Sequence, residues 1–137
     1  MKLRLYFITL ITFLAIDSLW LGLIAPSFYR SQIGHLMADT ANFFAAGIFY
    51  LLYIYGLLFF VVEPAVKKND SNYLIRGALF GLITYATYDL TNFATLRDWT
   101  LLVTVVDMAW GTILCGLTTW VSVWAGKMLT KRNQASR

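Results

Sequence analysis

Three aspartates inside apolar stretches are the residues of this sequence best suited to do chemistry. Asp17, Asp89 and Asp107 each lie within a run of apolar residues long enough to be a membrane span. A charged side chain at the centre of a bilayer costs about 3 kcal/mol or more, so such acids usually face a protein interior or a water-filled cavity. Carboxyl groups in that setting bind protons or cations, or act as acid and base in catalysis.

The three acids lie at one depth if each span is an α-helix. The distances along the chain to the nearest boundary residue are nine residues for Asp17 (to Pro26), eight for Asp89 (to Arg97) and eight for Asp107 (from Trp99). At a rise of 1.5 Å per residue, all three lie roughly 12–14 Å below the same surface. We therefore expect the carboxyl groups to share one layer of the bundle.

Polar and aromatic side chains at helical spacing surround these acids, because residues three or four apart share a helix face. The same depth count on the second span adds a tyrosine. The candidates that accompany the acids are Trp20, Tyr50, Tyr85, Asn92 and Trp110. This pattern predicts an acidic polar pocket in the outer half of the bundle. The alternative is structural, since intramembrane Asp residues also hydrogen-bond across helices, at about 1 kcal/mol per contact.

Four apolar runs must position these residues, over 5–25, 43–62, 77–96 and 99–125. Each is long enough to cross a hydrocarbon core of about 30 Å as a helix. The fourth is longer than needed, which predicts a tilt or a kink. The segment 27–42 is long enough for a short amphipathic piece at the outer surface. The sequence therefore predicts an all-α fold, a four-helix transmembrane bundle forming a single membrane domain over residues 1–137.

Composition and charge support a membrane protein. Hydrophobic residues make up 59% of the chain and charged residues 13%, against roughly 25% charged in soluble domains. Nine of the eleven basic residues flank the spans on one side: Lys2, Arg4, Lys67, Lys68, Arg76, Lys127, Lys131, Arg132 and Arg137. Because positive charge concentrates in cytoplasmic segments, this predicts an N-in, C-in topology. Such residues contact anionic lipid headgroups at the cytoplasmic face, and we expect no nucleic-acid partner.

The chain has too few cysteine and histidine residues for most metal sites. Cys115 is the single cysteine and His35 the single histidine. One subunit therefore cannot form a disulfide, a thiolate zinc site or a histidine cluster. We predict no metal site and no cofactor from this sequence.

Three segments carry a resemblance to a known family. They are residues 76–99 (RGALFGLITYATYDLTNFATLRDW), 16–20 (IDSLW) and 106–110 (VDMAW). With these segments the chain resembles a family of small predicted bacterial membrane proteins that is classified only as a domain of unknown function. The resemblance implies a multi-pass protein of the bacterial inner (plasma) membrane. It implies no catalytic residue.

Three functions remain open at this point. The acids could bind a cation, a proton or a small lipid-like ligand, as in a transport element, and a full transport path would need a homodimer because four helices seldom enclose one. They could instead serve a membrane-embedded lipid-modifying enzyme or its membrane subunit, with separate acid and base roles. Third, the acids could bond to the helices of an assembly partner. We favour a ligand-binding pocket, and whether the protein is an enzyme stays open.

Overall fold

The computed structural model describes residues 1–136, and every regular element in them is helical. In chain order the elements are α1 (Lys2–Leu23), α2 (Ala25–Ile33), the 3₁₀ helix η1 (Gly34–Leu36), α3 (Phe43–Leu57), the π-helical turn η2 (Leu58–Val62), α4 (Glu63–Lys68), α5 (Tyr73–Thr95) and α6 (Leu101–Ala135). These residues contain no β-strand, so the all-α class predicted from the sequence is confirmed.

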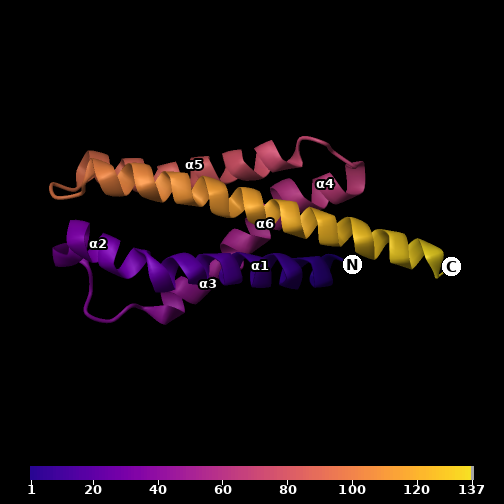
Figure 1. The fold of residues 1–137 in the computed structure, drawn as a ribbon, viewed down its shortest axis with the longest axis horizontal. Helices are drawn as coiled ribbons and strands as arrows, with labels where there is room; N and C mark the ends of the chain where they lie inside the picture. The colour runs from indigo at the N-terminus through magenta and orange to yellow at the C-terminus, as the bar shows by residue number, and fades with distance from the viewer. Residues whose placement is uncertain (137) are drawn as a thin grey trace.

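The long helices α1, α5 and α6 run lengthwise through the molecule, and both chain termini lie at the same end (Figure 1). We call this the terminal end; α4 and the connection to α5 also lie towards it. The opposite end, called the α2 end, holds α2 and the α5–α6 connection. The helix α6 is continuous over 35 residues, about 50 Å at 1.5 Å per residue. No break interrupts it, and in Figure 1 it runs obliquely to α1.

The helical irregularity lies in the second apolar run instead. There α3 passes into the π turn η2 before α4 begins, with Pro64 in the first turn of α4. A proline lacks the backbone N–H and its ring clashes with the carbonyl four residues earlier, here that of Phe60 within the π turn. A π turn widens the helix locally and relieves that clash.

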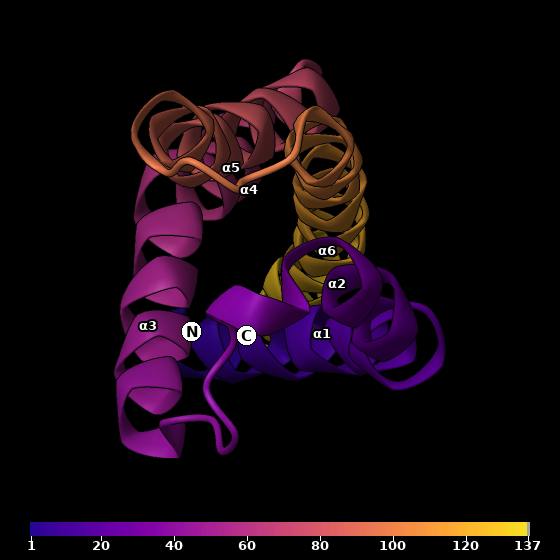
Figure 2. The same cartoon turned by 90° about the vertical axis from the view of Figure 1, so that its left-hand side faces the viewer.

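The second run also changes its neighbours along its length. Its first part, α3, packs on α1, whereas η2 packs on α5 and α6 as well. Figure 2 shows α3 crossing the side of the bundle obliquely, from the α1 edge towards the α5 edge. The helices α3 and α5 therefore diverge towards the α2 end.

The helices α5 and α6 form an antiparallel hairpin that packs very closely. A Cβ on Gly77 would lie 2.2 Å from Thr119 Oγ1, and one on Gly81 would lie 2.2 Å from the carbonyl oxygen of Gly111. Glycines four residues apart allow this approach between membrane helices. The GxxxG pair of α5 is thus used for packing inside the chain, and it fixes the α5–α6 register that positions Asp89 and Asp107.

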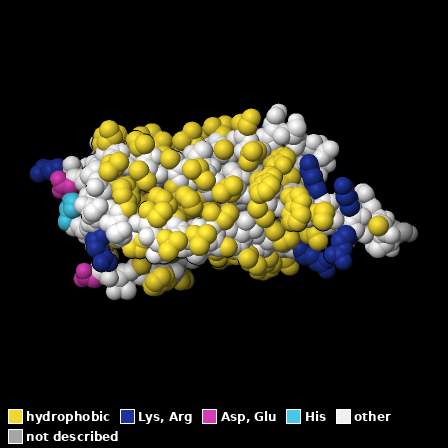
Figure 3. Space-filling view, in the orientation of Figure 1, with side chains coloured by type: hydrophobic (Ala, Val, Ile, Leu, Met, Phe, Trp, Pro, Cys, Tyr) yellow, Lys and Arg dark blue, Asp and Glu magenta, His cyan; other side chains and the backbone are white. Residues whose placement is uncertain are grey.

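The outside of the bundle is apolar. Hydrophobic side chains cover the middle of the molecule, and Lys and Arg gather at the terminal end (Figure 3). Within residues 1–136, three helices are long and apolar enough to cross a membrane: Lys2–Leu23, Phe43–Lys68 and Leu101–Ala135. The 23-residue α5 is not one of them. Exposed side chains such as Phe44, 80% accessible, suit contact with lipid tails rather than water.

The segment after α1 is mostly helical, since α2 and η1 occupy residues 25–36. Pro26 lies in the first turn of α2, a position that needs no N–H donor. Phe28 and Tyr29 follow on the same helix. Both side chains are partly buried against a small cluster of Ile33, Trp99 and Val103. The helix α2 therefore covers the α2 end of the bundle with its aromatic side chains turned inward.

Candidate functional site

Asp17 ties three helices together. It lies on α1, is 6% exposed, and accepts hydrogen bonds from two aromatic donors. Tyr50 Oη on α3 donates to Asp17 Oδ2 at 2.8 Å, and Trp110 Nε1 on α6 donates to Oδ1 at 3.1 Å. Both carboxyl oxygens thus have a partner, and this arrangement suits a structural role.

The two tryptophans predicted beside the acids stack on each other. The rings of Trp20 and Trp110 have centroids 4.7 Å apart and an interplanar angle of 10°. Each tryptophan follows an aspartate by three residues, on helices that run in opposite directions. The stack lets Trp110 reach the aspartate of the other helix, Asp17. The indole nitrogen of Trp20 is buried without a hydrogen-bond partner among residues 1–136.

Asp107 is contacted from the α2 end. Tyr29 Oη on α2 donates a short hydrogen bond to Asp107 Oδ1. Burial raises the pKa of Tyr29 above the ordinary phenol value, and the bond to Asp107 raises it further. Tyr29 therefore remains protonated at neutral pH and keeps donating to the carboxyl group. This contact could not be predicted from the sequence, because Tyr29 lies outside the four apolar runs.

Asp89 is the most isolated of the three acids. It lies on α5, is fully buried, and neither carboxyl oxygen has a hydrogen-bond partner within residues 1–136. The carboxyl group of Asp107 on α6 interacts with it. The structure thus separates the acids into two environments. Both carboxyl oxygens of Asp17 accept a hydrogen bond, whereas Asp89 and Asp107 form a pair.

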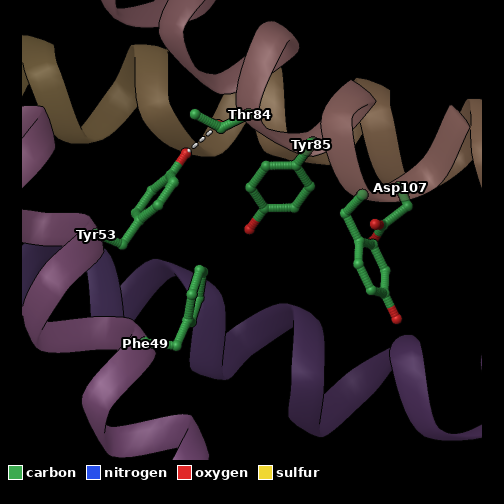
Figure 4. Close-up of a pocket in the computed structure, with 6 residues that line it drawn as sticks. Phe49, Tyr53, Thr84, Tyr85 and Asp107 are labelled. Atoms are coloured by element: carbon green, nitrogen blue, oxygen red, sulfur yellow. Dashed lines mark hydrogen bonds between the residues drawn. The ribbon is translucent and has the colours of Figure 1, made fainter. Parts of the chain in front are cut away.

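A cavity of about 390 Å³ lies between α3, α5 and α6, beside this acid pair. Its lining residues are Phe49, Tyr53, Thr84, Tyr85, Tyr88 and Asp107. Figure 4 shows the rings of Phe49, Tyr53 and Tyr85 around the space, with Asp107 at the far side. The cavity occurs where α3 and α5 diverge. Asp107 is its single carboxylate, so the cavity is aromatic rather than acidic.

A chain of hydrogen bonds fixes the wall of the cavity nearer the terminal end. Thr84 Oγ1 donates to the carbonyl oxygen of Phe80 at 2.8 Å. A hydroxyl has one proton, so Tyr53 Oη must be the donor in its 2.7 Å bond to Thr84 Oγ1. Cys115 Sγ, 3.0 Å from Tyr53 Oη, then donates to the phenol. The chain joins α6, α3 and α5, so the Tyr53 ring is held in place.

The remaining predicted residues differ in their relation to the cavity. Tyr85 lines it, with its ring packed directly on Gly111 of α6. Asn92 is half-buried near the end of α5, and it neither lines the cavity nor hydrogen-bonds to an acid within residues 1–136. Sequence reasoning did not single out the other lining residues, Phe49, Tyr53, Thr84 and Tyr88. The available signal was the helical spacing of Tyr53 from Tyr50 and of Tyr88 from Tyr85, three residues in each case.

No set of three or more His, Cys, Asp or Glu side chains in the described part of the chain is placed to hold a metal ion. The arrangement offers instead aromatic faces, phenol hydroxyls and carboxyl groups. These groups can enclose an apolar molecule and neutralise or hydrogen-bond one polar or positive group.

Comparison with known proteins gives one match. The model of a family described as "Predicted membrane protein (DUF2177)" matches residues 2–124. No curated protein and no solved structure matches the chain.

Proposed function

The chain belongs to the DUF2177 family of predicted membrane proteins, and we propose that it crosses the membrane four times with both termini in the cytoplasm. The fourth span in this proposal is α5, which is 23 residues long and packs along α6. The two termini lie at the same end, as an even number of crossings requires. We place the protein in the bacterial inner membrane on the resemblance of its sequence.

The charge distribution supports this orientation. Lys and Arg side chains gather at the terminal end (Figure 3), and Glu63 there is ion-paired with both Lys2 and Lys67. Clustered basic side chains next to spans favour the cytoplasmic side and attract anionic lipid headgroups. The terminal end is therefore the cytoplasmic face in this proposal, and the cavity lies in the outer half of the bilayer.

Reporter fusions test the topology directly. Fusions after Lys68 and at the C-terminus are expected to report a cytoplasmic location, because basic residues flank both points. A fusion after Asp98, in the α5–α6 connection, is expected to report the opposite side. If the fusions after Lys68 and Asp98 report the same side, α5 does not cross the membrane and the four-span topology is wrong.

The molecular function proposed is binding of a small amphipathic molecule in the cavity between α3, α5 and α6. The cavity carries this proposal: about 390 Å³ falls within the roughly 300–1,000 Å³ of ligand sites. Its walls are mostly aromatic, and Asp107 supplies one polar anchor. Two of the lining residues, Phe49 and Tyr88, are about half exposed on the outside of the bundle, so a ligand could enter the cavity from the lipid side.

Transport is an extension of this binding function. A single set of four helices rarely encloses a path across the bilayer, so transport through this site calls for a homodimer. Catalysis on a lipid is less well supported by the geometry. The thiol of Cys115 is fully buried and engaged with Tyr53, so it does not face the cavity as a nucleophile.

Removal of one cavity wall tests ligand binding. We expect Phe49→Ala to weaken binding of phenyltrimethylammonium and of its neutral isostere tert-butylbenzene by about tenfold, because an aromatic contact to a bound ligand contributes about 1.4 kcal/mol. Binding is measured by tryptophan fluorescence with the protein in nanodiscs, and empty nanodiscs give the baseline for partitioning into lipid.

Phe44→Ala is the matched control. Phe44 is on the same helix, is 80% exposed and does not line the cavity, so its loss should leave both affinities unchanged. The binding function is refuted if neither probe binds saturably. It is also refuted if Phe44→Ala and Phe49→Ala weaken binding equally.

A further inference from the structure

The position of Asp89 is not explained by ligand binding in the cavity alone. Asp89 does not line the cavity, is fully buried, and both its carboxyl oxygens have no hydrogen-bond partner in the described chain. A buried polar group without partners costs about 1–3 kcal/mol, and more if it is charged. An expensive residue at such a site points to a role that needs a carboxyl group.

Within residues 1–136, the titratable groups that interact with Asp89 are an acid and phenols. Asp107 faces it from α6, and Tyr29 from α2 donates to Asp107. On α5 itself Tyr88 interacts with both Asp89 and Asp107. Tyr85, one helical turn before Asp89, interacts with Asp107 and with Asp17 on α1. Within residues 1–136 the Lys and Arg side chains pair with other acids, Glu63 and Asp70, and the imidazole of His35 lies near Asp98. In the described part of the chain, neither Asp89 nor Asp107 thus forms a salt bridge.

Two adjacent carboxyl groups without a counterion do not both ionise readily. Each charge disfavours the other in a poorly hydrated site, so such a pair retains one proton between its members. A positive charge brought close to the pair reverses this preference, because it stabilises both carboxylates. The proton then leaves, and one positive charge has replaced another.

We propose that the Asp89–Asp107 pair is an exchange site, at which an organic cation entering the aromatic cavity displaces one proton. This inference rests on the proposed binding function and names its ligand class: amphipathic ammonium or phosphonium cations. Asp107 lines the cavity and meets the cation, while the buried Asp89 is the group that gains and loses the proton. The faces of Tyr53, Tyr85 and Tyr88 supply the cation–π contacts that quaternary cations favour.

The test compares phenyltrimethylammonium with tert-butylbenzene, which has the same shape but no charge. For the wild-type protein in nanodiscs, the Kd of the cation should fall about tenfold for each unit of pH increase between about pH 6 and pH 8, since one proton is displaced. A pH indicator should record one proton released per cation bound. The Kd of the neutral probe should not change with pH, and it should release no proton.

Substitutions assign the effect to the pair. Asp89→Asn should abolish the pH dependence and the proton release while the neutral probe still binds. Asp17→Asn should keep the pH dependence and the proton release. Asp17 lies outside the pair, and its carboxyl oxygens already accept hydrogen bonds from Tyr50 and Trp110. If Asp89→Asn does not fold, the wild-type protein alone tests the exchange site. It should release one proton when phenyltrimethylammonium binds and none when tert-butylbenzene binds.

The outcomes separate the two proposals. A cation Kd that is independent of pH in the wild type overturns the exchange site, as does a pH dependence that survives in Asp89→Asn. If both probes bind and are weakened by Phe49→Ala without any pH effect, the binding function stands and the exchange falls. If neither probe binds, both proposals fall.

Discussion

Replacement of Asp17 by alanine is expected to lower the free energy of unfolding by about 2–4 kcal/mol, since each buried donor left without an acceptor costs about 1–3 kcal/mol. Two donors lose their acceptor at once, the Tyr50 hydroxyl and the Trp110 indole N–H. These bonds hold α3 and α6 against α1, so the loss affects the packing of three helices. Equilibrium unfolding in mixed SDS micelles, followed by tryptophan fluorescence, measures the change.

Two further variants show that the effect belongs to these hydrogen bonds. Asp17→Asn keeps one acceptor oxygen, so its destabilisation should be about half that of alanine. Ser18→Ala changes the next residue of the same helix, which is exposed and bonds only to the carbonyl oxygen of Leu14, and should change stability by less than about 0.5 kcal/mol. If Asp17→Ala is as stable as the wild type, Asp17 does not hold the bundle together.

The helical character of the fold could be predicted because the apolar runs are long and uninterrupted. Counting residues from the span boundaries was also informative at one point. It placed Asp17 and Tyr50 at one depth, and a hydrogen bond joins these two residues. Trp110, which was included for its helical spacing from Asp107, donates to Asp17 as well. Depth follows from the constant rise of a helix, so it can be read from a sequence without knowledge of neighbouring helices.

The rotation of each helix about its axis could not be predicted in the same way. It depends on packing details such as the close approach of Gly81 to Gly111, and it decides that Asp89 meets Asp107 rather than Asp17. The aromatic cavity depends on the path of α3, whose π turn precedes Pro64. The contact of Tyr29 with Asp107 depends on how α2 folds back over the bundle. None of these features changes the local hydrophobic pattern.

The packing of α5 on α6 leads to the second large expected effect. Gly81→Ala should lower the free energy of unfolding by at least about 1–3 kcal/mol, the usual cost of overpacking. The new Cβ would lie 2.2 Å from the carbonyl oxygen of Gly111 and 2.7 Å from Cys115 Cβ. The nearest obstacle is backbone, which cannot rotate away, so the two helices must separate. The same SDS unfolding measurement gives the change.

Gly116→Ala is the matched control on the same interface. Gly116 lies on α6, and its added Cβ would come no closer than 3.7 Å to Ala78 Cβ on α5, an ordinary van der Waals contact. Alanine is also the better helix former by up to about 1 kcal/mol, so this variant should be as stable as the wild type or slightly more stable. Equal destabilisation by both substitutions would mean that the loss reflects glycine content rather than the close approach at Gly81. A stable Gly81→Ala would mean that α5 and α6 are farther apart than the structure has them, and the Asp89–Asp107 pair would then be separated too.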